Sequence, residues 1–411
     1  MYIPRPTKLL FQYDDGWSRY LDKHGDTLSD WTQLAVERML ACGTCAMGVR
    51  RYCCASPDCT HTRFFCQSCK SKACSSCGLK ATEQWIAEQQ HILPDCDWQH
   101  ITFTMPHLLW PFFNNNWPLL NELFRCATRA MLRWARRQGI EVGIFCALHT
   151  YGRQLNQHPH IHVSVTRGGL DVKHHVWRQL FFKKKAVEAI WRNAVIYLLR
   201  DNYDRINPGS LPGLGHIRSE DRWHRYLHAQ YRRCWKVHFA KKTRGAWRSV
   251  KYLGRYLKRP PVAASQLRHY RGGAVVHQYY DHRTQQHKRQ KISQEEMLQR
   301  YVSHIPARHF KMVRYYGFLA NRKRGAAAEG LRRAGDDGTG ETEAARVRGA
   351  DEKFPGHRPI PVHPLQRPAA FCRRHGGRAC HQTAVRQAAP AGKETMASDP
   401  VSGLVRLKNG V

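Results

Sequence analysis

His158-Pro159-His160-Ile161-His162-Val163-Ser164-Val165 is the stretch of sequence that decides the fold. Polar and bulky apolar residues alternate along it, which is the pattern of a β-strand with two different faces. We expect this strand to end at Gly168-Gly169. Since side chains two residues apart in a strand point to the same face, His160 and His162 project side by side. Two imidazoles in this arrangement can bind one metal ion.

A second element, residues 249–261, changes how the histidine pair is interpreted. Its sequence predicts a helix that is stopped by Pro260 and Pro261. Tyr252 and Tyr256 are four residues apart and therefore share a face of this helix. The cations around them, which would stabilise a phenolate or a phosphate and which we predict to contact DNA, are Lys251, Arg255, Lys258 and Arg259.

Each element has an ordinary explanation when it is taken alone. The histidines would also suit the surface, the core or a structural zinc site, and the tyrosines would suit the half-buried face of an amphipathic helix. In combination, a metal-binding histidine pair and a phenol nucleophile are the groups needed to attack a phosphodiester. The two elements together therefore favour a metal-dependent reaction on nucleic acid.

Several motifs carry a resemblance to a known family. His160-Ile161-His162 resembles the motif of the HUH endonucleases, in which a bulky apolar residue separates two histidines, and the Tyr-Leu-Gly-Arg-Tyr sequence at 252–256 resembles their two-tyrosine class. The sequence segments at 149–152 and 314–322 are similar to those of bacterial transposases of the insertion-sequence ninety-one family. The resemblance runs from near the N-terminus to about Arg322.

The resemblance implies an α+β protein in three parts. A zinc-binding domain with N-terminal helices occupies residues 1–93, and an HUH-type catalytic domain with a central antiparallel sheet flanked by helices occupies residues 94–322. Residues 323–411 contain few large apolar residues and no helical or strand periodicity, so we predict a disordered tail. Because the resemblance stops abruptly there, out-of-frame translation of the tail is a sharper hypothesis.

The resemblance also implies a reaction. His160 and His162 would hold Mg²⁺ or Mn²⁺ with a third ligand, for which we nominate His149 first and Gln154 second. Tyr252 or Tyr256, whichever acts first, would form a 5′-phosphotyrosine, so that single-stranded DNA at the ends of the element is nicked and rejoined in rolling-circle-type transposition. The alternatives are a plasmid replication initiator or relaxase with the same chemistry, and a zinc-dependent DNA-binding protein without catalysis.

Composition limits the partner and the compartment. The 411-residue chain has a formal net charge of +36, which predicts a polyanionic partner such as DNA. No apolar run of about 18 residues, the length that a membrane span requires, occurs in the sequence. The first 16 residues contain charged side chains and do not look like a signal peptide. We therefore expect a bacterial cytoplasmic protein associated with the nucleoid.

Most of the 15 cysteines lie between Cys42 and Cys77. Cys-x-x-Cys pairs at 42/45, 66/69 and 74/77 have the spacing of zinc ribbons, and His61 is a further candidate ligand. A reducing cytosol disfavours disulfides. We expect one or two structural Zn²⁺ ions, and the spacing does not decide which thiols share a metal. The predicted ligands are Cys42, Cys45, Cys54, Cys59, Cys66, Cys69, Cys74 and Cys77.

The remaining sequence predicts scaffold elements. We expect a strand at 99–106, to which we assign no chemistry, helices at 115–138 and 171–200, and a hairpin within 274–292. A basic and aromatic segment lies between the second helix and the hairpin, at 221–240. Aromatic residues mixed with cations can stack on unpaired bases, although core packing is the other interpretation; these residues are Trp223, Tyr226, Tyr231 and Trp235.

Overall fold

The computed structural model describes residues 6–324, apart from 55–58, 90, 175, 258–260, 264–265, 268–272 and 282–283. Nearly all of the predicted tail, from residue 325 to 411, lies outside the described residues, as do Lys258 and Arg259. Residues 51–64 belong to a different compact unit from the other described residues and are treated by themselves below.

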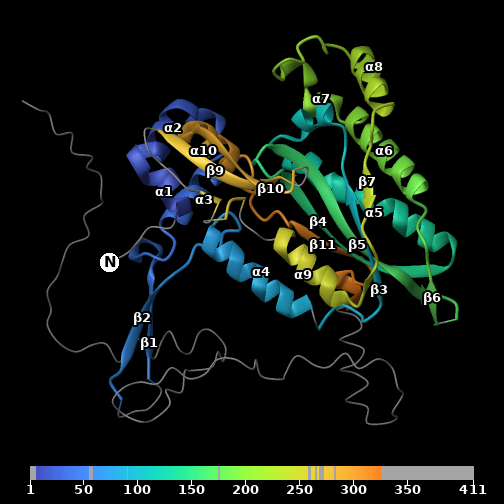
Figure 1. Cartoon of the computed structure of the whole chain (residues 1–411), viewed down its shortest axis with the longest axis horizontal. Coiled ribbons are helices and arrows are strands. Elements are labelled where there is room, and N and C mark those ends of the chain that lie inside the picture. The colour runs from blue at the N-terminus through green and yellow to red at the C-terminus, as the bar shows by residue number, and fades with distance from the viewer. Residues whose placement is uncertain are drawn as a thin grey trace, which may run out of the picture. The chain divides into compact units, whose positions relative to one another are not determined.

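The centre of the protein is a seven-stranded sheet in the order β11-β4-β5-β3-β7, with β6 beside β5 and β8 beside β3 (Figure 1). All of its strand pairs are antiparallel. The predicted α+β class with a central antiparallel sheet is therefore confirmed. The strands are β3 (Asp97–Phe103), β4 (Ile140–Tyr151), β5 (Gln157–Asp171), β6 (Trp177–Gln179), β7 (Val237–Phe239), β8 (Thr243–Arg244) and β11 (Val313–Gly317).

β5 continues through Gly168 and Gly169, where the sequence predicted its end. A Cβ atom at Gly169 would lie 2.2 Å from the carbonyl oxygen of Glu141 on β4. A Cβ atom at Gly168 would lie 2.5 Å from Nε1 of Trp177 on β6. The prediction was wrong because these glycines permit close approach of neighbouring strands instead of a turn.

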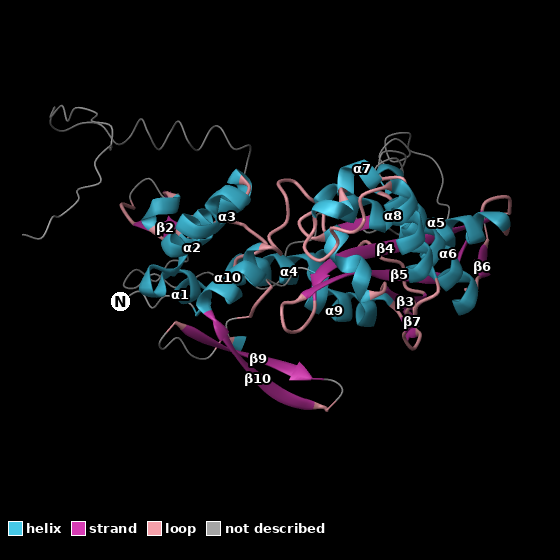
Figure 2. Ribbon diagram, turned by 90° about the horizontal axis from the view of Figure 1, so that it is seen from above, coloured by secondary structure: helices cyan, strands magenta, loops and turns pink. Residues whose placement is uncertain are grey.

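One face of the sheet is covered by α5 (Trp117–Arg137) and by α6 (Lys184–Arg200), and α8 (Glu220–Tyr231) packs against α6 (Figure 2). The short α7 (Tyr203–Ile206) follows α6. The predicted helix at 171–200 is wrong in its first part, because residues 171–179 pair with the sheet as the end of β5 and as β6. The buried residues that β4 and β5 contribute to this core are Ile144, Cys146, Leu148, Ile161, Val163 and Val165.

Two of the aromatic residues that were considered for base stacking belong to this core. Trp223 is 0% exposed and Trp235 is 3% exposed. The Trp223 indole also donates a hydrogen bond to the carbonyl of Leu199. Core packing is therefore the correct interpretation for both tryptophans, and neither is available to an unpaired base.

The opposite face of the sheet is covered by α4 (Ser75–Gln89) and α9 (Ala246–Leu257), which lie side by side (Figures 1 and 2). Val250 and Leu253 of α9 are buried together with Trp98 of β3 and with Phe145 and Ala147 of β4. Because side chains alternate along a strand, the next residue of β4 on this face is position 149. The helix that carries the two tyrosines therefore covers the face of the sheet to which the histidines belong.

A further core joins two regions that are far apart in sequence. The N-terminal helices pack with the hairpin of β9 (Ala274–Asp281) and β10 (Gln286–Ser293) and with α10 (Gln294–Val302). Gln294 donates hydrogen bonds to the carbonyls of Leu10 and Tyr13, and the fully buried Tyr301 donates one to the carbonyl of Ala73. The N-terminal helices are α1 (Pro6–Gln12), α2 (Gly16–His24) and α3 (Asp30–Leu40).

The predicted hairpin within 274–292 is confirmed. β9 and β10 pair over their whole lengths. Ser293 caps α10, since its hydroxyl accepts a hydrogen bond of 3.1 Å from the backbone N–H of Glu296. A separate two-stranded hairpin is formed by β1 (Val49–Cys53) and β2 (Thr62–Cys66). Within the described residues, the helices lack the combination of length and apolar character needed to cross a membrane.

Replacement of Tyr301 by phenylalanine is expected to lower the free energy of unfolding by about 1–2 kcal/mol, since the Ala73 carbonyl loses a donor inside the core. Urea denaturation followed by tryptophan fluorescence measures the change. Tyr197→Phe, at a tyrosine that is 55% exposed, is the matched control and should change stability by less than about 0.5 kcal/mol. A Tyr301→Phe variant as stable as this control would contradict the prediction.

Candidate functional site

Three histidines meet on the face of the sheet covered by α9. In the pairing of β4 with β5, His149 lies opposite His160, and the neighbouring pair on the same face places His162 opposite Ala147. The three ring centroids are 4.8 to 5.1 Å apart. One nitrogen from each ring lies within 4.8 Å of the others, and all three side chains are buried. The structure thus brings the nominated third ligand beside the predicted pair.

Hydrogen bonds orient two of the three rings. Nδ1 of His160 donates to the carbonyl of His158 at 2.6 Å, so that Nε2 carries the lone pair. Nδ1 of His162 lies 3.1 Å from Nε2 of His100 and 3.3 Å from the Thr102 hydroxyl. Nδ1 of His162 is therefore occupied by neighbouring side chains, and Nε2 is the atom suited to a metal ion.

The electrostatics keep these rings neutral. Burial lowers the pKa of both His160 and His162 well below the ordinary value, and the neighbouring His149 lowers it further. Burial also lowers the pKa of His100 to about 3. Neutral imidazole is the form that binds metals. At neutral pH a divalent cation would therefore displace no proton from His160 or His162.

Sequence reasoning missed the residues that support His162. His100 and Thr102 lie on β3, next to β5, and Nδ1 of His100 lies 3.2 Å from the hydroxyl of Ser164. The strand at this position was predicted, but no chemistry was assigned to it. The alternation of Trp98, His100 and Thr102 along the strand was the available signal, because it places a histidine and a hydroxyl on one face.

The alternative third ligand lies elsewhere. Gln154 is exposed and its amide donates a hydrogen bond of 2.7 Å to the Tyr279 hydroxyl. His158 is a neighbour of the cluster, with its ring 4.6 Å from the His160 ring and 4.7 Å from the Trp110 ring.

Both predicted nucleophiles, Tyr252 and Tyr256, belong to α9. Their side chains and that of Arg255 lie outside the described residues, so their roles stay predictions. Lys251 is exposed on the same helix, and its Nζ lies 4.9 Å from the centre of the Trp247 ring. Its position is compatible with the predicted contact to phosphate.

A second cluster consists of four thiols, Cys42, Cys69, Cys74 and Cys77. Their sulfur atoms all lie within 4.8 Å of one another, with separations of 3.5 Å for 42/77, 3.7 Å for 69/77 and 3.8 Å for 42/74. Tetrahedral zinc with Zn–S bonds of about 2.3 Å places its sulfurs roughly 3.8 Å apart. The four thiols therefore fit one zinc ion.

The surroundings of these thiols favour a bound cation. Burial raises the pKa of Cys42 to about 11. A hydrogen bond from Cys69 lowers the pKa of Cys74 to about 4. Backbone N–H groups of Cys69 and Ser71 point at the sulfurs of Cys42 and Cys69, at 3.3 and 3.4 Å. Since several buried thiolates repel one another, a divalent cation is needed to ionise all four.

The other predicted zinc ligands are not part of this four-thiol cluster. Cys45 and Cys66 are exposed, with sulfurs 3.8 Å apart. In the segment that connects β1 to β2, the sulfur of Cys59 lies 3.6 Å from Nδ1 of His61, and the backbone N–H of Cys54 donates a hydrogen bond to the carbonyl of His61. The assignment of these four cysteines to zinc stays a prediction: Cys45, Cys54, Cys59 and Cys66.

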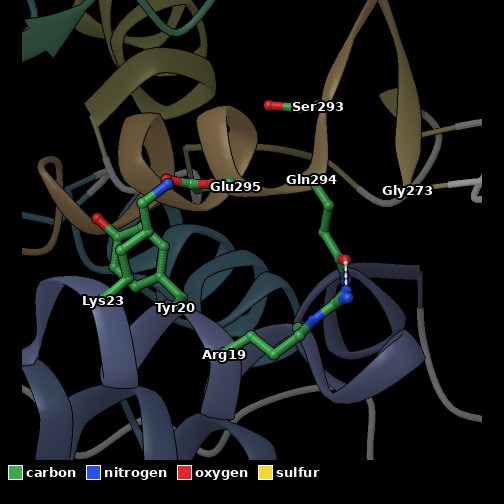
Figure 3. A pocket seen from close by; sticks show the side chains of 8 residues that line it. Arg19, Tyr20, Lys23, Gly273, Ser293, Gln294 and Glu295 are labelled. Atoms are coloured by element: carbon green, nitrogen blue, oxygen red, sulfur yellow. Dashed lines mark hydrogen bonds and ion pairs between the residues drawn. The ribbon is translucent and has the colours of Figure 1, made fainter.

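A cavity of about 330 Å³ lies apart from both clusters, between α2 and the start of α10 (Figure 3). Its cationic side chains are paired: Lys23 lies 2.8 Å from Glu295, and Arg19 lies 2.8 Å from Asp14 and 3.3 Å from Gln294. The lining contains no metal-binding cluster, and its charges compensate one another. We therefore place the candidate site at the histidines and not in this cavity.

Comparisons with known proteins agree with this arrangement. Residues 12–105 match the family described as "Transposase zinc-binding domain", and residues 143–326 match the family described as "Putative transposase". The first range contains the four-thiol cluster, and the second contains all three clustered histidines and α9. No solved structure matches the chain.

Two curated relatives match over most of the chain. The chain is 48% identical over 324 residues to "Transposase for insertion sequence element IS801" of Pseudomonas savastanoi pv. phaseolicola, which covers 78% of either chain. It is 28% identical over 292 residues to "Putative transposase y4qJ" of Sinorhizobium fredii, which covers 69% of this chain and 73% of that protein.

The sheet with its histidine cluster, attached to a cysteine-rich zinc-binding domain, thus defines a transposase. More narrowly, the chain belongs to the insertion-sequence ninety-one (IS91) family of transposases. The resemblance that the motifs indicated is confirmed, and DNA is the partner that a transposase requires.

Cys74→Ser is expected to lower the zinc that remains bound after dialysis against a chelator by about one equivalent, because three ligands hold a structural zinc ion poorly. Released zinc is measured with a colorimetric indicator. Cys234→Ser, at an exposed cysteine outside the cluster, is the control and should retain the full amount. Equal zinc retention by the two variants would exclude the four-thiol assignment.

His100→Ala is expected to weaken Mn²⁺ binding about 10- to 100-fold, since the ring of His162 loses the group that orients it. Titration of zinc-loaded protein, followed by the electron paramagnetic resonance of free Mn²⁺, gives the dissociation constant. His216→Ala, at an exposed histidine, is the control. Unchanged affinity in His100→Ala would show that the contact with His162 does not support a metal site.

Proposed function

We propose that this transposase nicks and rejoins single-stranded DNA at the ends of its element through a covalent phosphotyrosine. The observation that carries the proposal is the position of the histidine cluster: His149, His160 and His162 occupy the face of the sheet covered by α9. Tyr252 and Tyr256 are residues of that helix. The metal-binding groups and the nucleophiles thus belong to neighbouring elements on one face.

The three imidazoles would hold Mg²⁺ or Mn²⁺. When bound, the ion supplies a Lewis acid that polarises a non-bridging oxygen of the scissile phosphate. Imidazole alone is not a preferred environment for these hard cations, so oxygen ligands from water and DNA would complete the site. The buried neutral rings position the ion, and their hydrogen bonds to the carbonyl of His158 and to His100 hold them in place.

The hydroxyl of Tyr252 or Tyr256 is the proposed nucleophile. Its oxygen forms a bond to phosphorus while the bond to the 3′-oxygen of the preceding nucleotide breaks. The phenol gives up its proton, and the departing 3′-oxygen becomes a hydroxyl. The 5′-phosphotyrosine conserves the phosphodiester bond energy, so that another 3′-hydroxyl can later displace the tyrosine without an energy source. Two tyrosines allow two strands to be held at once.

The charge and the names of the relatives support DNA transposition over the other functions. A net charge of +36 favours a polyanion. Both curated relatives are described as transposases, which disfavours a plasmid replication initiator or a relaxase. The buried histidine cluster, in turn, disfavours a purely structural DNA-binding protein. In the proposed division of roles, the four-thiol cluster binds Zn²⁺ and stabilises the N-terminal part.

The double variant Tyr252→Phe and Tyr256→Phe is expected to abolish covalent attachment to a labelled single-stranded oligonucleotide that carries an element end, because phenylalanine has no nucleophilic oxygen. The attachment is seen as a shifted band on a denaturing gel in the presence of Mn²⁺. Tyr197→Phe, at an exposed tyrosine of α6, should give the wild-type band. A shifted band that persists in the double variant would refute the assignment of the nucleophiles.

A further inference from the structure

Helix α9 contains a glycine at the point where it meets α4. Gly254 is buried, and a Cβ atom at this position would lie 2.5 Å from both Cγ1 and Cδ1 of Ile86 and 3.6 Å from Cζ3 of Trp85. Glycine weakens a helix interior compared with alanine. A glycine here therefore has a packing reason: it forms the depression in α9 that accepts the Ile86 side chain of α4.

Helix α4 is itself held firmly on the sheet. The Trp85 indole donates a hydrogen bond of 2.9 Å to the Tyr315 hydroxyl, and that hydroxyl donates one of 2.8 Å to the Gln89 side chain. Tyr315 belongs to β11, the strand that pairs with β4. At the other end of α4, Cys77 of the four-thiol cluster lies in the first turn. Helix α4 is thus fixed at both ends by groups outside itself.

The described side chains of α9 also contact the sheet. Val250 and Leu253 are buried against the sheet, and the hydroxyls of Ser249 and Thr243 lie 2.8 Å apart near its start. Gly254 follows Leu253 directly and falls between the two tyrosine positions in the sequence. The contact with Ile86 therefore acts at the part of α9 that carries the nucleophiles.

We propose that Gly254 and Ile86 are positioning residues for the nucleophilic tyrosines, and that α4 sets the place of α9 on the sheet through their contact. This role rests on the proposed phosphotyrosine chemistry. In-line attack on a phosphate requires close alignment, and a misplacement of about 1 Å can cost about 100-fold in rate. A methyl group at position 254 would lie 2.5 Å from two carbons of the Ile86 side chain, so the packed Ile86 side chain or one of the two helices must shift.

The test compares Gly254→Ala, Ile86→Ala and the double variant as full-length, zinc-loaded proteins. The single-turnover rate of covalent attachment is measured at saturating single-stranded DNA with Mn²⁺. We expect Gly254→Ala to slow attachment at least about tenfold, with DNA and Mn²⁺ dissociation constants within about twofold of wild type. In the double variant the alanine methyl occupies the space left by Ile86, and the rate should return to within about threefold of wild type. Gly25→Ala, where nothing lies within 4 Å of the added Cβ, is the control.

The rescue separates a positioning role from general destabilisation, since truncating Ile86 restores the rate only if the two side chains meet. A wild-type rate in Gly254→Ala, or a folded double variant that stays as slow as Gly254→Ala, would overturn the proposal. If Gly254→Ala does not fold, the double variant decides alone: folding with a near wild-type rate supports the contact, and a folded but slow or a misfolded protein refutes it. Wild-type protein that binds DNA without forming an adduct would instead overturn the proposed function itself.

Discussion

The pairing of β4 with β5 is the constraint on which the rest of the structure depends. Its register places His149 opposite His160 and brings His162 onto the same face. Because strand side chains alternate, a slip by one residue would turn every histidine toward the core under α5. Ile161 and Val163, which are buried in that core, oppose such a slip. The apolar residues of one face thus hold the polar residues of the other in register.

Burial gives the histidine cluster its chemical character. In water an imidazole is partly protonated near neutral pH, whereas here removal from water lowers the pKa of His160 and His162 and keeps both rings neutral. The hydrogen bonds of His160 to a backbone carbonyl and of His162 to His100 then fix which nitrogen faces outward. Neutral, oriented imidazoles suit a divalent cation. In a strongly basic protein, that cation can bind together with DNA, whose phosphates neutralise the surrounding positive charge.

Helix α4 connects the two clusters mechanically. Its first turn contains Cys77 of the four-thiol cluster, its Trp85 donates a hydrogen bond to Tyr315 of β11, and its Ile86 contacts α9 at Gly254. The region after α9 also returns to the N-terminal part, where Tyr301 contacts the backbone of Ala73, next to Cys74. The four-thiol cluster and α4 therefore support the sheet face that carries the histidines.

The sequence by itself determined the main elements of the site: alternation predicted the histidine strand, and the Tyr-Leu-Gly-Arg-Tyr segment predicted a helix. It also nominated His149 as the third residue beside the histidine pair. Tertiary structure decided what local patterns cannot express. It separated Cys45 from Cys42 in spite of their Cys-x-x-Cys spacing, placed His100 beside His162, and buried Trp223. The physical reason is that periodicity reports which residues share a face, whereas the atoms that meet across that face depend on strand register and on packing between segments far apart in the chain.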